Sequence, residues 1–176
     1  NPVSDLDFLQ TRKEEINFFF RHGFYLKLYK RQLDYIEYYL KNRRSPLRDN
    51  IIDARFDALS NKISLNSYYY TISEGIFHIV QLLIDLVTFI EEARTLILPL
   101  SLEKELEKIK KITISKKLNG LFNNPPKQAS DLSSRQINKL DQLFRLTEKN
   151  AFRELLDTVY KIDVLQTLSQ IMKNEG

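Results

Sequence analysis

The sequence predicts an all-α protein, an elongated multi-helix array around one long central helix. Gly occurs 4 times and Pro 5 times in 176 residues, too few for the many turns of a β-sandwich or barrel. Leu, Ile, Lys, Glu and Gln, which favour helix, are abundant. Hydrophobic residues make up 43% of the chain, as in a packed protein rather than a disordered tail.

The first helix is expected to begin near Ser4 and Asp7, whose side-chain oxygens can satisfy unpaired backbone N–H groups, and to end at His22-Gly23. A second helix is expected from Phe24 to Lys41, because Ser45-Pro46 breaks the pattern. Its predicted inner face is formed by four apolar residues: Leu28, Leu33, Ile36 and Leu40.

The dominant feature is a helical pattern from Asn66 to about Leu98, ended by Pro99. It corresponds to roughly thirty residues and some 45 Å, longer than a small domain is wide, which indicates an extended body. Polar side chains interrupt this stretch, so it is expected to be a buried helix rather than a membrane span. Its apolar residues recur at steps of three and four: Tyr69, Ile72, Ile76, Ile79, Leu83, Leu86, Ile90, Ala93 and Ile97.

The remaining elements are expected between and after these helices in the sequence, and all of them are expected to form a single domain over residues 1–176. Residues 50–66 are ambiguous and allow one short helix through Ile52, Phe56 and Leu59. After Pro99, a helix is expected over Leu102–Leu118 with Leu106, Ile109 and Ile112 inward, followed by a break from Asn119-Gly120 to Pro126. A further helix, capped by Ser133 or Ser134, is expected to run through Leu146. The last helix is expected from Asn150 to Met172, with these residues inward: Phe152, Leu155, Leu156, Val159, Ile162, Leu165, Leu168 and Ile171.

The sequence offers no chemistry for an enzyme. The chain contains 0 cysteines, which excludes disulfides, thiol catalysis and Cys-based zinc sites. Neither of two glycine-rich phosphate-binding motifs, G-x-x-x-x-G-K and G-x-G-x-x-G, occurs. His22 and His78 are too far apart to share a helix turn. Asp49, Asp53 and Asp57 recur every four residues and could bind a hard metal, but a solvated acidic face balanced by nearby arginines is favoured. No catalytic, cofactor-binding or metal-binding residue is predicted.

Basic residues are concentrated in two stretches. Residues 21–48 hold eight basic residues against two acids, and residues 101–130 hold seven lysines against three glutamates. A polyanion is one possible partner, and solvated helix faces are the alternative. The tyrosines of residues 35–39 and 68–70 could stack on bases, although most are expected to pack between helices. The candidate DNA-binding residues are Arg43, Arg44, Arg48, Lys110, Lys111, Lys116 and Lys117.

Two stretches resemble the helical core of the MutS family of mismatch-repair ATPases. The opening Asn1-Pro2-Val3-Ser4-Asp5, followed by Leu9, Arg12, Ile16 and Phe19, resembles the N-P-apolar-[S/T]-D run and the I-x-x-R-x-x-x-I helix that begin that core. The closing Leu155, Leu156, Tyr160, Ile162-Asp163-Val164-Leu165 and Leu168 are similar to the D-V-L segment at its far end. The middle of the chain shares helical character only.

The resemblance implies the lever of a clamp-less MutS-related protein, because the interval between the motifs is too short for the family's β-rich clamp and has no strand pattern. It implies a fragment of a larger cytoplasmic DNA-repair protein that binds double-stranded DNA. The ATPase domain of the same polypeptide, with ATP and Mg²⁺, would lie outside this chain, and direct mismatch recognition would also lie elsewhere. A homodimer is possible, and no membrane partner or cofactor of this chain is expected.

Two other classes remain open. A stand-alone helical nucleic-acid-binding module would use the basic residues named above and would bind with a steep salt dependence. A protein–protein scaffold, such as a dimerisation domain, would use the tyrosine-rich faces.

Overall fold

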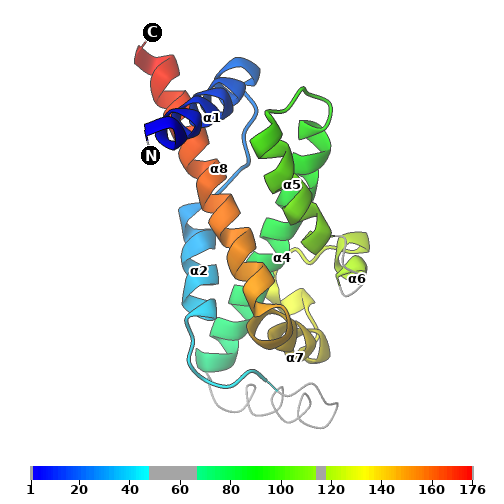
Figure 1. Ribbon diagram of the computed structural model, residues 1–176. Coiled ribbons are helices and arrows are strands. Elements are labelled where there is room, and N and C mark those ends of the chain that lie inside the picture. Colours follow the sequence, from blue (N-terminus) through cyan, green and yellow to red (C-terminus); the bar gives the residue numbers. More distant parts are fainter. Residues whose placement is uncertain (1, 48–66, 114–117, 176) are drawn as a thin grey trace. The chain divides into compact units, whose positions relative to one another are not determined.

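The computed structural model describes residues 2–47, 67–113 and 118–175, and within these ranges every regular element is helical (Figure 1). The all-α fold class is therefore confirmed. Several predictions fall outside the described ranges: the helix through Ile52, Phe56 and Leu59, the aspartates Asp49, Asp53 and Asp57, and the candidate cations Arg48, Lys116 and Lys117.

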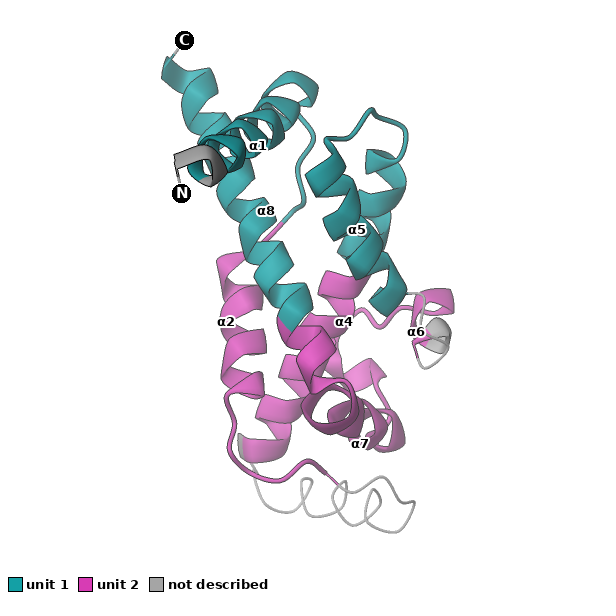
Figure 2. Cartoon of the chain, in the orientation of Figure 1, with its two compact units in different colours: residues 1–27, 85–115, 154–176 teal, residues 28–84, 116–153 magenta. Residues whose placement is uncertain are grey.

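The helices form two compact units (Figure 2). Unit 1 comprises Asn1–Lys27, Asp85–Ser115 and Glu154–Gly176, and unit 2 comprises Leu28–Ile84 and Lys116–Arg153. Two long helices, α4 (Ser67–Ala93) and α8 (Lys149–Glu175), each have residues in both units. Whether the chain is one domain over residues 1–176 stays a prediction.

Helix α1 (Pro2–His22) ends where the sequence predicts. Gly23 adopts a left-handed φ of 61°, and its N–H donates to the Phe19 carbonyl at 3.0 Å, as in a helix C-terminus closed by glycine. The helix begins at Pro2 rather than Ser4. Pro is well suited to this first turn, since its missing N–H has no intrahelical partner there in any case.

Helix α2 (Lys30–Leu40) begins six residues later than the predicted Phe24. The preceding segment is non-helical: Phe24 stacks on Phe89 with ring centroids 4.4 Å apart, and Leu26 is buried. An extended chain points alternate residues to one side, so it can bury both. Of the four predicted inner residues, Ile36 is fully buried and the three leucines are half-buried. The other buried residues of α2, Gln32 and Tyr39, were not predicted.

Helix α4 is the long helix that the sequence predicts, with 27 residues and a length of about 40 Å. It ends at Ala93, about five residues early, and Ile97, predicted to face inward, is 93% exposed. The Thr95 hydroxyl donates to the Glu92 carbonyl at 2.8 Å, and Leu98 precedes a proline, which disfavours helix at that residue. The buried stripe includes Ile72, Ile76, Ile79, Leu83, Leu86 and Ile90.

By length and composition, Tyr68–Ala93 is the one helix among the described residues that could cross a membrane. The core helix of a water-soluble protein passes the same test, and 56% of its most apolar window is buried inside the protein.

Helix α5 (Leu100–Thr113) starts directly after Pro99 and buries Leu102, Leu106 and Ile109, while Ile112 is half-buried. The predicted break at Asn119-Gly120 was wrong, because both residues belong to the short helix α6 (Asn119–Asn123). Non-helical residues follow α6 from Asn124, and a 3₁₀ turn, η1 (Ala129–Asp131), precedes the next helix.

Helix α7 (Ser134–Gln142) has the predicted cap: Ser133 and Gln136 form a reciprocal capping box. The helix does not continue regularly to Leu146, because η2 (Leu143–Thr147) is a π-helical turn. The final helix, α8, extends from Lys149 to Glu175. Its predicted inner residues are buried as far as Leu165, whereas Leu168 and Ile171 are 41% and 46% exposed. Near this end of α8 the buried face runs through Gln166 and Ser169 instead.

Candidate nucleic-acid interface

Four of the seven candidate DNA-binding residues lie in the described ranges. Arg43 and Arg44 follow α2 in unit 2, and both are exposed. Lys110 and Lys111 lie in the last turn of α5 in unit 1, where Lys111 is exposed and Lys110 is half-buried. The structure therefore groups these cations as two pairs, and each pair belongs to a different unit.

The lysine pair lies beside an ion pair. Arg94 Nη2 and Glu107 Oε1 are 2.8 Å apart. The hydrogen bond from Arg94 lowers the pKa of the Glu107 carboxyl, and the charges of Lys110 and Lys111 lower it further. The positive charge of this α5 turn is thus partly balanced by Glu107.

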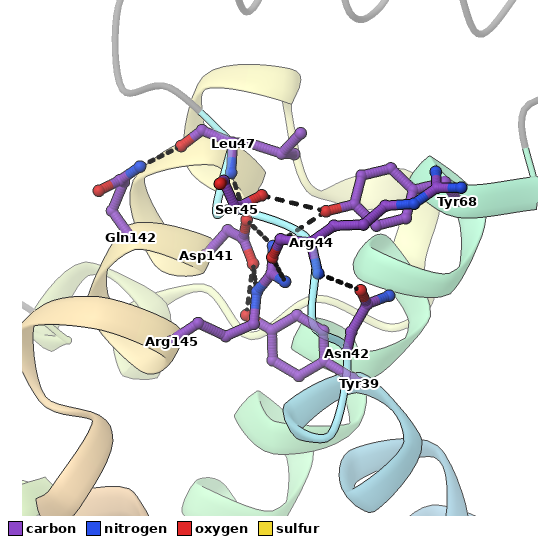
Figure 3. A network of polar contacts seen from close by, with 9 residues as sticks. All are labelled: Tyr39, Asn42, Arg44, Ser45, Leu47, Tyr68, Asp141, Gln142 and Arg145. Carbon is purple, nitrogen blue, oxygen red and sulfur yellow. Dashed lines mark hydrogen bonds and ion pairs between the residues drawn. The ribbon is translucent and has the colours of Figure 1, made fainter.

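The arginine pair lies on a segment held by a buried polar network in unit 2 (Figure 3). Asp141, at the end of α7, is fully buried. Its carboxylate accepts a hydrogen bond from the Leu47 backbone N–H at 2.6 Å and from the Tyr39 hydroxyl at 2.7 Å. Gln142 Nε2 donates to the Leu47 carbonyl. These bonds attach the segment 42–47 to α7 and to α2.

Arg145 supplies the positive charge of this network. Its Nε and Nη2 each donate to one carboxylate oxygen of Asp141 at 2.6 Å, a bidentate arrangement that is geometrically specific. Its Nη1 donates to the Arg44 carbonyl at 2.9 Å, and its Nη2 also contacts the Tyr68 hydroxyl at 3.3 Å. The π-helical turn contains Arg145 and places its side chain back over Asp141, four residues earlier.

The network shifts the pKa values of its members. Burial raises the pKa of the Tyr39 hydroxyl well above its usual range, and the adjacent Asp141 carboxylate raises it further. Burial by itself would lower the pKa of the Arg145 guanidinium, but its hydrogen bonds and ion pair with Asp141 raise that pKa. Tyr39 is therefore neutral and Arg145 charged at any physiological pH.

Arg44 is positioned through both its backbone and its side chain. Its carbonyl accepts from Arg145, and its guanidinium lies over the ring of Tyr68, 4.6 Å from the centroid. The Tyr68 hydroxyl in turn donates to the Ser45 carbonyl at 3.2 Å. The ring of Tyr68 is consequently occupied by Arg44 and is not free to stack on a base.

The tyrosines expected to pack between helices divide into two groups. Tyr39 is fully buried and Tyr35 stacks on His78 at 4.8 Å. Tyr38 and Tyr70 are instead 66% and 59% exposed.

The two histidines belong to different units: His22 contacts Phe18 in unit 1, and His78 is in unit 2. Within the ranges that the structure covers, no group of three or more His, Asp or Glu side chains could hold a metal ion.

A second buried acid lies in unit 1. Glu15 of α1 is fully buried, and its carboxylate oxygens lie 3.0 Å from Arg12 Nη1 and 3.0 Å from Lys161 Nζ. Lys161 of α8 also lies 3.9 Å from Glu105. This ion pair connects α1 and α8, which cross near the top of Figure 1.

Sequence reasoning missed Tyr39, Asp141, Arg145 and Glu15. Asp141 and Arg145 have the four-residue spacing of a helical ion pair, but so do many exposed pairs, and only burial distinguishes this one. Comparison of the chain with protein-family models, curated proteins and solved structures found no match in any of the three.

Proposed function

We propose that this chain is the non-catalytic helical core, or lever, of a MutS-like DNA mismatch-repair protein. It couples DNA binding to an ATPase domain of the same polypeptide that lies outside this chain. ATP and Mg²⁺ belong to that ATPase domain, double-stranded DNA is the substrate, and the protein acts in the cytoplasm.

The observation that carries the proposal is the pairing of the two MutS-like segments within unit 1. Arg12, in the opening motif, and Lys161, next to the closing Ile162-Asp163-Val164-Leu165 motif, both contact the buried carboxylate of Glu15. A buried carboxylate with two cationic partners fixes the two helices to each other, because removing either partner would leave charge uncompensated. Segments about 150 positions apart in sequence thereby form one structural junction.

A continuous α4 supports a mechanical role. The helix has no break from Ser67 to Ala93, and its apolar stripe is buried among neighbouring helices. Closely packed helices resist smooth deformation, so a displacement applied to such an element is transmitted as a rigid-body shift.

The exposed apolar residues of the two MutS-like segments support a covering partner. Leu6 and Leu9 are 67% and 61% exposed, and Val164 and Leu168 are 56% and 41% exposed. Exposed apolar residues clustered on adjacent helices are typical of a surface that another domain covers. The ATPase domain is the partner that this proposal assigns to them, and a homodimer partner is the alternative.

The test is DNA-stimulated ATP hydrolysis by the polypeptide that contains this chain. We expect its sequence to include a Walker A motif after Gly176. We expect Lys161→Met to leave basal hydrolysis intact but to reduce its stimulation by duplex DNA, because the junction around Glu15 is weakened. The control is Lys149→Met, which removes an exposed lysine from the first turn of α8. A polypeptide without a nucleotide-binding motif would overturn the proposal, as would unchanged stimulation in the Lys161→Met variant.

The exposed Arg43 and Arg44 favour a second candidate function, a stand-alone nucleic-acid-binding module. This module would bind duplex DNA equally tightly whether or not an ATPase domain is attached. The lever predicts instead that nucleotide bound to the ATPase domain changes DNA affinity, since coupling between two binding sites is reciprocal.

A further inference from the structure

Unit 2 contains the predicted Arg43 and Arg44 together with two exposed cations that the sequence did not single out. The exposed face of α7 carries Arg135 and Lys139, four residues and thus about 6 Å apart along the helix axis. Gln142, three residues after Lys139, donates its hydrogen bond to the Leu47 carbonyl. The α7 face and the segment 42–47 therefore adjoin through contacts within one unit (Figure 3).

Within the part of the chain that the structure describes, this surface carries more positive than negative charge. Residues 42–47 and 133–147 contain a single acid, Asp141, and it is buried and paired with Arg145. Among the described acids that flank these segments, Glu37 pairs with Lys41 at 2.5 Å, Asp131 accepts hydrogen bonds from the backbone N–H groups of Lys127 and Gln128, and Glu148 is half-buried. The described residues of these two segments carry four exposed cations: Arg43, Arg44, Arg135 and Lys139.

The partner that fits this chemistry is a phosphate backbone. Membrane insertion is disfavoured, because α7 buries its apolar residues Ile137 and Leu140 and leaves only Leu146 exposed just beyond its end. Base stacking is disfavoured as well, since the Tyr68 ring beside Arg44 is already covered by that guanidinium. Cations without an available aromatic platform suit phosphates of a duplex better than unpaired bases.

We propose that Arg43, Arg44, Arg135 and Lys139 form one contact surface for the phosphate backbone of double-stranded DNA. The identity of the polyanion rests on the DNA-linked function proposed above, whereas the surface itself rests on the geometry of unit 2. The buried network of Asp141 and Arg145 serves as its positioning element, because it fixes the segment 42–47 against α7. Binding is expected to be independent of base sequence, since contacts to phosphates carry no sequence information.

Salt dependence gives this surface a numerical signature. Four phosphate contacts predict a slope of about −3.6 for the logarithm of the binding constant against the logarithm of salt concentration, or roughly a 100-fold loss of affinity between 50 and 200 mM salt. Removing two of the four cations reduces the magnitude of the slope by about 2 and weakens binding at 50 mM salt by at least about tenfold.

The experiment measures fluorescence anisotropy of a labelled 30-base-pair DNA duplex titrated with the chain at several salt concentrations. The variants Arg135→Gln/Lys139→Gln and Arg43→Gln/Arg44→Gln should each bind at least about tenfold more weakly at 50 mM salt, and their salt slopes should be smaller in magnitude by about 2. The control Lys13→Gln/Lys104→Gln removes the same charge from exposed positions in unit 1 and should retain both. Unchanged circular dichroism and urea midpoints would establish that all variants fold.

Equal losses in the control would overturn the surface, because binding would then follow net charge alone. Tighter binding of a single-stranded oligonucleotide of the same length would overturn the assignment to a duplex backbone. Absence of binding at 50 mM salt would also overturn the surface, yet it would leave the lever proposal intact, since DNA-stimulated ATP hydrolysis tests the lever separately.

Discussion

The backbone of Gly75 on α4 lies directly against the side chain of Tyr39 on α2. A Cβ atom added at Gly75 would lie 2.3 Å from Tyr39 Cβ and 2.5 Å from its Cγ. Because both atoms are close to the α2 backbone, a larger residue at position 75 would have to displace the whole helix. The hydroxyl of the same Tyr39 donates to Asp141, so the close approach connects α4 to the buried network.

We therefore expect Gly75→Ala to destabilise the chain. Alanine would gain about 1 kcal/mol of helix propensity, but the overlap with Tyr39 should cost more, with overpacking in a core typically costing 1–3 kcal/mol and occasionally more. The expected net loss is about 2 kcal/mol in urea unfolding. Glu91→Ala, an exposed change in the same helix, should remain within about 0.5 kcal/mol of the wild type. A stabilised Gly75→Ala variant would contradict the close approach.

A second prediction concerns the Asp141–Arg145 pair. Arg145→Met should destabilise the chain by about 3–5 kcal/mol, because it leaves the Asp141 carboxylate buried without its cationic partner. The double variant Asp141→Leu/Arg145→Met removes both charges and should recover a substantial part of that loss. Urea unfolding of the single and double variants measures the difference. Equal stability of Arg145→Met and wild type would show that the pair is solvated rather than buried.

The environment of His78 predicts a pH dependence of stability. Burial lowers the pKa of the His78 imidazole, and the charge of Arg31 lowers it further, while the Glu74 carboxylate, 3.9 Å away, opposes the shift. The folded chain then binds fewer protons than the unfolded chain, in which the pKa is about 6.5. The free energy of unfolding should therefore fall as the pH drops through 6.5 and level off below the folded pKa.

The measurement is the urea midpoint from pH 8 to pH 5 for the wild type and for His78→Gln. The loss of stability attributable to His78 should disappear in His78→Gln. Glu74→Gln removes the opposing charge, so in that variant the loss should extend to lower pH. Identical pH profiles for the wild type and His78→Gln would refute the effect of burial.

The capping box of α7 provides a simpler test. Ser133→Ala removes the hydroxyl that accepts from the Gln136 backbone N–H and the partner of the Gln136 side chain, and should cost about 1 kcal/mol. Ser134→Ala, one residue into the helix, is the matched control and should change the free energy of unfolding little. A larger effect at Ser134 would place the cap one residue later.

The reliability of the sequence-based predictions differs among the helix boundaries. Two ends marked by a specific local signal were predicted correctly, Gly23 after α1 and Ser133 before α7. Two others were not, since α1 begins before Ser4 and Asn119-Gly120 lies inside α6. Boundaries inferred only from apolar periodicity were less accurate: α2 begins at Lys30 rather than Phe24, and α4 ends at Ala93 rather than near Leu98. Phe24 and Ile97 both continue a helical pattern in the sequence. Phe24 nevertheless lies in a non-helical segment that packs on the core, and Ile97 lies in the turn before Pro99.

The candidate DNA surface was predictable only in part. The run Arg43-Arg44 is visible as local charge, whereas Arg135 and Lys139 are ordinary exposed residues of a helix until hydrogen bonds place α7 beside residues 42–47. The sequence likewise gives no sign that Asp141 is buried, because its partners Tyr39 and Leu47 lie about 100 positions away.

By itself, the sequence determined the helical fold class, the long helix and the local caps, because these depend on propensities and spacings within a few residues of each other. The tertiary structure alone decided which face of α2 is buried, which acids are removed from solvent and which cations share a surface. Those properties depend on contacts between segments distant in the chain, such as Tyr39 with Gly75 and Arg145 with Arg44. Burial, rather than residue type, decides whether a charged side chain stabilises the fold or is exposed to a partner.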